Sequence, residues 1–300
     1  MQYSRSIFDL VHERKSVRSY KDQPVARDVL RKIEESLKHM PDPPLRSRPR
    51  FVMAAAAEGD AESLKGLGTY GIIRKPAGFV IGAVRQDPDG LVDFGFCMQA
   101  IVLKLTDLRL GSCWLGGTFR KSRFAERIGA AGGECVPSVL PFGVPVEMKG
   151  ALETLMRAGA GSDRRKPFES LFFKSGFNRP LSREEAGPYG RILEAVRLAP
   201  SASNRQPWRV VLDPETGAFR FFLRRDPGYG LQLRWLRLLD LQRVDLGIAA
   251  CHFELTATEC GQPGVWTPPD GGLMPLPENT IHILTWNPTQ SRSSTCAASQ

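Results

Sequence analysis

The sequence lacks any apolar run long enough to cross a membrane. None of its stretches reaches 18 consecutive apolar residues, and a transmembrane helix needs about that length. The first 20 residues are polar and charged, without the apolar segment of a secretory signal. We therefore expect a cytoplasmic protein that begins at or near Met1 and has no membrane partner.

Residues that hold metal ions or act as nucleophiles are also scarce. The chain has four histidines and six cysteines, and no two cysteines form a C-x-x-C pair. It has no phosphate-binding P-loop, no G-x-G-x-x-G that opens a helix, no G-x-S-x-G and no H-E-x-x-H. These absences argue against a metal site and against hydrolysis by a side-chain nucleophile. A bound cofactor that supplies its own reactivity fits such a sequence better.

Acidic residues are outnumbered by basic ones, giving a formal net charge of +9. This excess could reflect nucleic-acid binding, an anionic surface or a phosphorylated ligand. However, the basic residues are scattered among acidic ones, and no nucleic-acid-binding motif is visible. We therefore expect no nucleic-acid partner and favour a local anion site.

The chain contains a diverged internal repeat. Residues 92–96 (VDFGF) and 244–248 (VDLGI) both open apolar helices, and each is followed by a tryptophan. The paired Asp, Gly and Trp residues are each 152 positions apart. Two short amphipathic helices that end at Pro41 and Pro200 form a second pair. Duplication explains this order better than chance does.

The repeat predicts two halves of an α+β sandwich, residues 1–160 and 175–300, joined by a linker over 161–174. The stretch 157–167 at this join is rich in Gly, Ser and basic residues, a composition typical of linkers. The last ten residues are small and polar, and we expect disorder there. Expected helices are 7–13, 26–38, 93–109, 184–198 and 240–260, and expected strands are 50–55, 78–84, 138–146, 208–213, 218–224 and 281–286.

Two segments are the main candidates for binding. Arg14, Ser16 and Arg18 form an R-x-S-x-R motif, whose two guanidinium groups and hydroxyl suit a phosphate. The alternative is a solvated basic turn. Residues 199–208 (APSASNRQPW) form an irregular polar loop between a helix and a strand. This second segment could also be an ordinary connection, and Trp208 is expected in the core under both interpretations.

Two further segments give weaker signals. Gly116 and Gly117 would let the backbone approach a flat ligand, although a simple turn explains them equally well. Arg164 and Arg165 lie in a basic run that could hold the same phosphate or could be a solvated linker.

Taken together, these segments resemble the FMN-dependent nitroreductase family. Residues 14–18 match its N-terminal R-x-S-x-R, and residues 200–208 match its more specific P-S-x-x-N-x-Q-P-W loop. Gly116 and Gly117 fall where the family has a glycine loop near the flavin. The resemblance covers most of the chain and implies a nitroreductase-like fold that binds FMN.

The sequence departs from the usual family pattern, in which two identical subunits build two flavin sites. Its first half keeps R-x-S-x-R but has PDPPLRSRP at 41–49 in place of the loop. Its second half keeps the loop but has no R-x-S-x-R over 168–180. The chain thus resembles the single-chain branch of the family, a fused pseudo-dimer with one complete site. We expect a monomer.

The resemblance also implies roles for the candidate residues. Arg14 and Ser16 would hold the FMN phosphate with Arg164 or Arg165, and Arg18 would face the pyrimidine edge of the ring, where a cation stabilises the reduced flavin. The loop that begins at Pro200 would line the ring or ribityl chain through Ser201, Ser203 and Asn204. Gly116 and Gly117 would lie near the reactive nitrogen and leave room for a substrate.

The implied activity is ping-pong oxidoreduction with NAD(P)H as donor and a nitroaromatic, a quinone or a similar electron-poor small molecule as acceptor. Another flavin reaction on this fold, such as dehalogenation, ene reduction or flavin breakdown, stays open because fold does not fix function. A flavin-binding protein without catalytic activity and a flavin-free nucleic-acid binder are the remaining alternatives.

Overall fold

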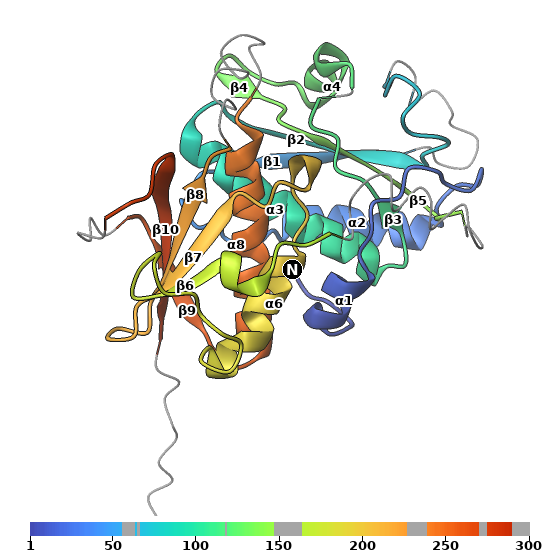
Figure 1. Cartoon of the computed structure of the whole chain (residues 1–300). Coiled ribbons are helices and arrows are strands. Elements are labelled where there is room, and N and C mark those ends of the chain that lie inside the picture. Colours follow the sequence, from blue (N-terminus) through green and yellow to red (C-terminus); the bar gives the residue numbers. More distant parts are fainter. Residues whose placement is uncertain are drawn as a thin grey trace, which may run out of the picture.

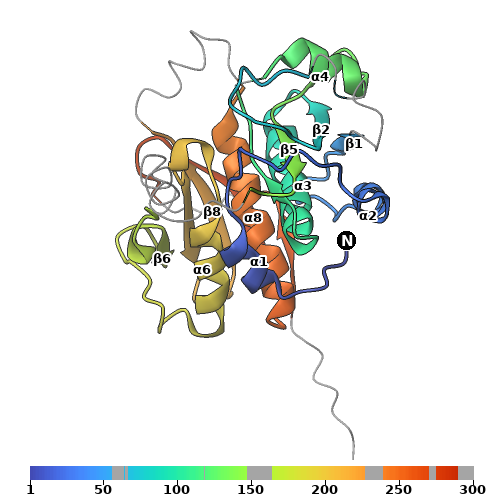
Figure 2. The same ribbon diagram turned by 90° about the vertical axis from the view of Figure 1, so that its right-hand side faces the viewer.

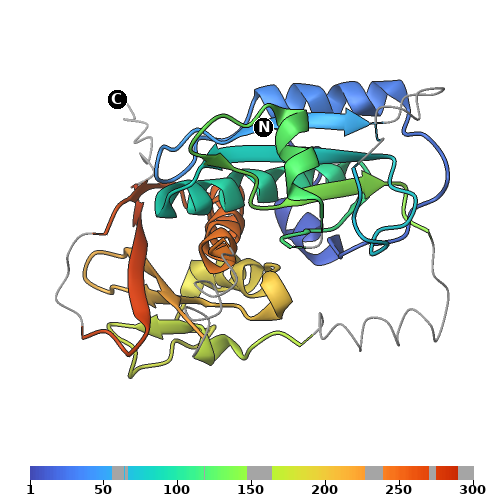
Figure 3. The ribbon, with the colours of Figure 1, turned by 90° about the horizontal axis from the view of Figure 1, so that it is seen from above.

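The computed structural model describes residues 1–55, 64, 67–117, 119–146, 164–226, 239–269 and 275–289. Within these residues the chain forms two five-stranded sheets with helices packed between them (Figures 1 and 3). The α-helices are α1 (Ile7–Glu13), α2 (Arg27–Lys38), α3 (Pro88–Asp107), α4 (Lys121–Ile128), α6 (Gly190–Leu198) and α8 (Leu241–Glu259). The mixed helix-and-sheet fold confirms the predicted α+β class.

The first sheet is antiparallel and has the order β1-β2-β5-β3, with β4 also paired to β2. The second sheet has the order β6-β7-β8-β10-β9, and only its β6–β7 pair is parallel. The strands are β1 (Arg50–Ala55), β2 (Gly78–Arg85), β3 (Gly111–Ser112), β4 (Glu134–Cys135), β5 (Val139–Gly143), β6 (Phe172–Lys174), β7 (Trp208–Leu212), β8 (Phe219–Arg224), β9 (Gly264–Thr267) and β10 (Thr280–Pro288). Each sheet therefore draws its strands from one side of the undescribed segment 147–163.

Helices α3 and α8 cross each other between the two sheets and make the most extensive contact among the described elements (Figures 1 and 3). At the crossing, a methyl group on Gly95 would lie 2.1 Å from the carbonyl oxygen of Val244. The reciprocal group on Gly247 would lie 1.9 Å from the carbonyl oxygen of Val92. Only glycine allows backbones to approach so closely. The repeated V-D-x-G motif therefore marks a near-symmetric contact between the two central helices.

Burial agrees with the apolar character of these elements. Seventeen of the 20 residues of α3 are buried, and Trp208 at the start of β7 is fully buried, as predicted. None of the described helices is both long and apolar enough to span a membrane.

The short helix α1 crosses from its own half onto the helices of the other (Figure 2). Its apolar residues Ile7, Leu10 and Val11 form a small cluster with Leu103 of α3 and Ala195 of α6. Because α1 is anchored there, the residues that follow it are held beside the end of α6. This contact determines where the R-x-S-x-R motif lies.

The predicted helices and strands all occur, with shifted ends. Helix α3 begins at Pro88, where the Asp87 side chain accepts the Gly90 N–H at 2.7 Å. Helix α6 begins only at Gly190, after the 3₁₀ turn η3 (Gly187–Tyr189). Helix α4 and strands β3, β4, β6 and β9 were not predicted, because α4 buries only Phe124 and Ile128 and these strands are two to four residues long.

Of the predicted linker 161–174, the part from 164 onward holds the 3₁₀ turn η2 (Phe168–Ser170) and strand β6. Residues 161–163, the Gly-rich stretch before them and the predicted disordered tail 291–300 lie outside the described residues. The domain boundaries therefore stay a prediction.

Candidate functional site

The R-x-S-x-R segment runs along the edge of the first sheet. Val17 donates its N–H to the carbonyl oxygen of Ser112 in β3 at 2.8 Å, and Arg74 donates its N–H to the carbonyl oxygen of Arg18 at 2.8 Å. The backbone is thus extended, and alternate side chains point to opposite sides. Val17 packs against Gly111, whereas Arg14, Ser16 and Arg18 all act on the Cys113 thiol and oppose the rise in its pKa that burial causes. The three predicted residues therefore lie on a common side.

The 200–206 loop has an unusual backbone. Ser203, Asn204 and Gln206 have φ angles of 50°, 53° and 48°, a left-handed conformation that non-glycine residues adopt seldom and that is enriched at functional sites. Asp245 of α8 holds the loop in place, because its carboxylate accepts the Ala202 N–H at 2.9 Å. Ser201 stabilises it internally by accepting the Gln206 N–H at 2.9 Å.

A buried aspartate also holds a loop in the other half. Asp93 of α3 is the repeat partner of Asp245, and its carboxylate accepts the N–H groups of Leu45 at 2.9 Å and Ser47 at 2.7 Å. Burial raises the pKa of Asp93 to about 6 and that of Asp245 well above its ordinary value. The buried aspartates of the repeat therefore each fix the loop of their own half.

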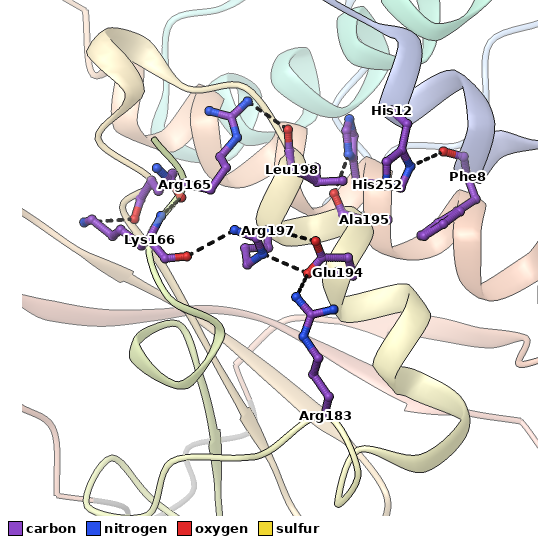
Figure 4. A network of polar contacts seen from close by, with 11 residues as sticks. Phe8, His12, Arg165, Lys166, Arg183, Glu194, Ala195, Arg197, Leu198 and His252 are labelled. Atoms are coloured by element: carbon purple, nitrogen blue, oxygen red, sulfur yellow. Dashed lines mark hydrogen bonds and ion pairs between the residues drawn. The ribbon is translucent and has the colours of Figure 1, made fainter. Parts of the chain in front are cut away.

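The basic segment at 164–166 is bound to the loop. The Arg165 guanidinium donates to the Asn204 side-chain oxygen. It also donates to the carbonyl oxygen of Leu198 at 3.0 Å (Figure 4). Asn204 in turn donates to the carbonyl oxygen of Arg164 at 2.9 Å, and Lys166 donates its N–H to the Gln206 side chain at 3.0 Å. The predicted residues Arg164, Arg165 and Asn204 thus form one connected unit.

Arg14 lies close enough to Arg165 for the two positive charges to interact. Burial, followed by the charge of Arg165, lowers the pKa of Arg14 to about 10. The residue keeps some solvent exposure, but its Nε is buried and has no hydrogen-bond partner. With the described residues Arg14 forms no ion pair, and the neighbouring Glu13 instead pairs with Arg5 and Arg109. An anion bound here would offset the repulsion between the two guanidinium groups and accept a hydrogen bond from the Arg14 Nε–H.

Gly116 and Gly117 differ in their surroundings. A methyl group on Gly116 would lie 2.7 Å from Leu241 at the start of α8, so this glycine permits close packing. A methyl group on Gly117 would meet no described atom within 4 Å, and Gly117 lines a pocket. The pair therefore lies against the second half on one side and open space on the other.

A buried chain of hydrogen bonds links this glycine segment to the other half. Trp114 donates its indole N–H to Gln99 at 3.1 Å, and Gln99 contacts His252 Nε2 at 2.8 Å. His252 Nδ1 contacts the carbonyl oxygen of Ala195 at 2.8 Å (Figure 4). Burial, with a smaller effect of Arg14 and Arg165, lowers the pKa of His252 to about 3. His252 is therefore neutral, accepts from Gln99 and donates to Ala195.

Some of these supporting residues could be found from the sequence and others could not. Asp245 belongs to the V-D-x-G repeat and Gln206 to the Q-P-W motif. Gln99 and His252 lie within apolar helices, where no spacing distinguishes them from other core positions.

Residues 6–257 match the model of a family described as "Putative TM nitroreductase". No curated protein matches the chain.

Solved structures give matches to the fold. A "putative nitroreductase" from Thermotoga maritima MSB8 is 21% identical, and the match covers 96% of this chain and 95% of that one with a TM-score of 0.60. A "putative nitroreductase" from Desulfovibrio desulfuricans, in complex with FMN, is 19% identical over 51% of this chain and 95% of its own, with a TM-score of 0.38. A nitroreductase family protein from Clostridium difficile 630 is 19% identical over 56% and 94%, with a TM-score of 0.39.

Proposed function

Because this chain belongs to the nitroreductase family whose model it matches, we propose that it is an FMN-dependent oxidoreductase driven by NAD(P)H. One observation carries the proposal: Arg14 of the first half interacts with Arg165, which lies in the segment leading into the second half, and the buried Arg14 Nε has no partner. Neither half alone would supply both groups, so the anion site requires the folded whole.

The phosphate of FMN fits this donor set. It carries about two negative charges and several acceptor oxygens, which suit guanidinium forks. The Arg14 Nε would gain its missing acceptor, and the repulsion between Arg14 and Arg165 would be offset. Ser16 and Arg164 lie on the two segments that carry these arginines and complete the proposed phosphate site.

The remaining candidates surround the expected position of the flavin ring. Arg18 lies on the same side of its segment as Arg14, where its charge would stabilise negative charge on the ring. Pro200, Ser201, Ser203 and Asn204 would form the wall contributed by the second half. Gly116 and Gly117 would present backbone N–H groups near the ring and leave one face open to the donor and acceptor.

FMN, when bound, would take two electrons from NAD(P)H and deliver them to an electron-poor acceptor such as a nitroaromatic or a quinone. The protein would orient the reactants and exclude water. His252 is a buried imidazole whose pKa of about 3 keeps it neutral, and its remaining N–H is committed to the Ala195 carbonyl, so it is a poor general acid. We therefore assign it a positioning role through Gln99 and Trp114, and water can supply the proton.

We propose one FMN per chain. In the other half, Trp266 occupies the repeat position of Trp114 and donates its indole N–H to Glu254 at 2.6 Å. Burial, with a smaller contribution from the nearby charge of Asp42, raises the pKa of Glu254 to about 7. The acidic side chains Glu254 and Asp42 thus lie near Trp266, whereas neutral and basic groups lie near Trp114. An anionic ligand is therefore disfavoured beside Trp266.

The test is the visible absorption spectrum of the purified protein after addition of FMN and desalting. We expect a retained flavin spectrum at about one FMN per chain, bleached by NADPH or NADH under nitrogen. Arg14→Ala should weaken FMN binding by about 1.5–3 kcal/mol, the usual contribution of a hydrogen bond to a charged group. Arg109→Ala, which changes an exposed arginine on the Glu13 ion pair, is the matched control.

The outcomes separate the parts of the proposal. Two FMN per chain would contradict the single composite site but keep the flavin. Equal FMN binding by wild-type protein and Arg14→Ala would remove Arg14 from the phosphate site. A folded protein that retains no flavin would contradict the proposed function.

A further inference from the structure

A pocket of about 620 Å³ opens beside Gly117, at the beginning of α4. Its lining comes from Tyr70 on one side and from Gly117 and residues 119–123 on the other. A volume of this size is typical of small-molecule sites. The residues proposed to hold the FMN phosphate do not line it.

Along the chain, both walls of the pocket lead to residues that hydrogen-bond to the backbone of the R-x-S-x-R segment. The Tyr70 wall leads to Arg74, which donates its N–H to the Arg18 carbonyl at 2.8 Å and accepts the Tyr20 N–H at 3.0 Å. The Gly117 wall follows Ser112, which accepts the Val17 N–H at 2.8 Å. Gly117, which belongs to the proposed flavin site, also lines the pocket, so the pocket adjoins that site and one molecule could extend from one to the other.

The pocket is cationic. Its lining includes three cations, Arg120, Lys121 and Arg123. Of these three, only Arg123 has an ion-pair partner among the described residues, Glu126 at 3.3 Å. The N-terminus of the eight-residue helix α4 also lies here, and no side chain caps it. Uncompensated cations beside free helical N–H groups favour a phosphorylated ligand.

The opposite wall offers an aromatic surface. The Tyr70 side chain is 69% exposed, and its φ of 50° is left-handed, a conformation uncommon for a non-glycine residue. Arg120 donates its N–H to the carbonyl of Gly68 at 3.2 Å, which ties this wall to the basic one. An exposed ring held at a cationic pocket suits stacking of a nucleic acid base beside its phosphate.

We propose that this pocket binds the phosphorylated adenosine end of NADPH and makes NADPH the preferred donor over NADH. Tyr70 stacks on the adenine, and Arg120 and Lys121 bind the 2′-phosphate that NADH lacks. The inference rests on the proposed function, because the nicotinamide end must reach the flavin. It adds the donor specificity and the residues that determine it.

Binding can be measured without turnover, by calorimetric titration of the FMN-loaded protein with adenosine 2′,5′-bisphosphate, adenosine 5′-phosphate and inorganic phosphate. We expect the bisphosphate to bind about tenfold more tightly than the monophosphate, since one charge-assisted contact supplies at least that factor. Arg120→Ala with Lys121→Ala should abolish the difference. Lys32→Ala with Arg85→Ala, two exposed cations elsewhere, should leave it unchanged.

Tyr70 has its own matched pair. Tyr70→Phe keeps the ring and should keep both affinities, whereas Tyr70→Ala should weaken both nucleotides by a similar factor. In the steady state, the ratio of kcat/KM for NADPH to that for NADH should fall with the double Arg120 and Lys121 variant, while the FMN content stays constant.

The results that overturn the inference differ from those that overturn the proposed function. Equal affinity for the two nucleotides, or an equally strong response to inorganic phosphate alone, would show an adventitious anion site while the flavin spectrum stands. Loss of flavin from a protein that still discriminates the nucleotides would remove the proposed function and keep the nucleotide pocket.

Discussion

His252 is a fully buried side chain of α8 that lies within electrostatic reach of Arg14 and Arg165. A protonated imidazole there would add a third positive charge to a dry environment, and Gln99 already donates to its Nε2. The folded protein therefore holds His252 neutral, with both ring nitrogens in hydrogen bonds that join α3, α6 and the glycine segment.

This state gives stability a defined pH dependence. The pKa of His252 falls from 6.5 to about 3 on folding, so the unfolded chain binds more protons between these values. The stabilisation is complete above about pH 6.5 and is lost as the pH falls toward about 3. In His252→Gln, which does not titrate, we expect this part of the dependence to disappear.

The measurement is urea unfolding of wild-type protein and His252→Gln at about pH 7.5 and about pH 4.5. The difference in free energy of unfolding should shrink by about 2–3 kcal/mol at the lower pH. Carboxylates such as Asp93, whose pKa is raised to about 6, contribute equally to both proteins and cancel. A difference that is constant with pH would contradict the neutral buried state.

At the scale of elements, the crossing of α3 and α8 depends on two glycines. Replacing a glycine inside a helix by alanine normally stabilises the helix by about 1 kcal/mol. Here Gly95→Ala and Gly247→Ala would each drive a methyl group to about 2 Å from a carbonyl oxygen of the other helix. We expect each substitution to lower the free energy of unfolding by about 3 kcal/mol or more.

Thermal or urea unfolding of the two variants tests this expectation, and the sign of the effect decides it. Gly132→Ala is the control, because Gly132 is exposed and an added methyl group meets no described atom within 4 Å. Stabilisation by Gly95→Ala would show that the helices do not cross as closely as the structure indicates.

At the scale of the whole molecule, the two sheets and their helices pack against each other around a shared centre. Helices α3 and α8 are central, and α1 packs onto the opposite half. We therefore predict a monomer in solution. Gel filtration with light scattering should give the mass of one chain, 33.2 kDa, and a mass of twice that value would contradict the prediction.

Much of the fold was predictable because its elements have strong local signals. The strands are short apolar runs between turn residues, and α2 and α6 end before prolines. Helix α4 was missed because its short, charged sequence resembles a loop, and its place is fixed by Phe124 and Ile128 packing under the first sheet. Tertiary contacts outweigh weak local preferences in such segments.

The sequence by itself determined which side chains are available at the site. R-x-S-x-R, the 200–208 loop and the V-D-x-G repeat can all be read from residue type and spacing. The repeat marked Asp93 and Asp245 as equivalent positions, and the loop motif marked residues 200–208, because both patterns are local to a few residues.

Only the tertiary structure decided how these parts meet. Arg14 and Arg165 are 151 positions apart in sequence, and their proximity arises because α1 packs on α6. The same is true of the Trp114, Gln99 and His252 chain and of the pocket between Tyr70 and Arg120. Distances between remote residues depend on how whole helices and sheets pack, and no local pattern of residues encodes that packing.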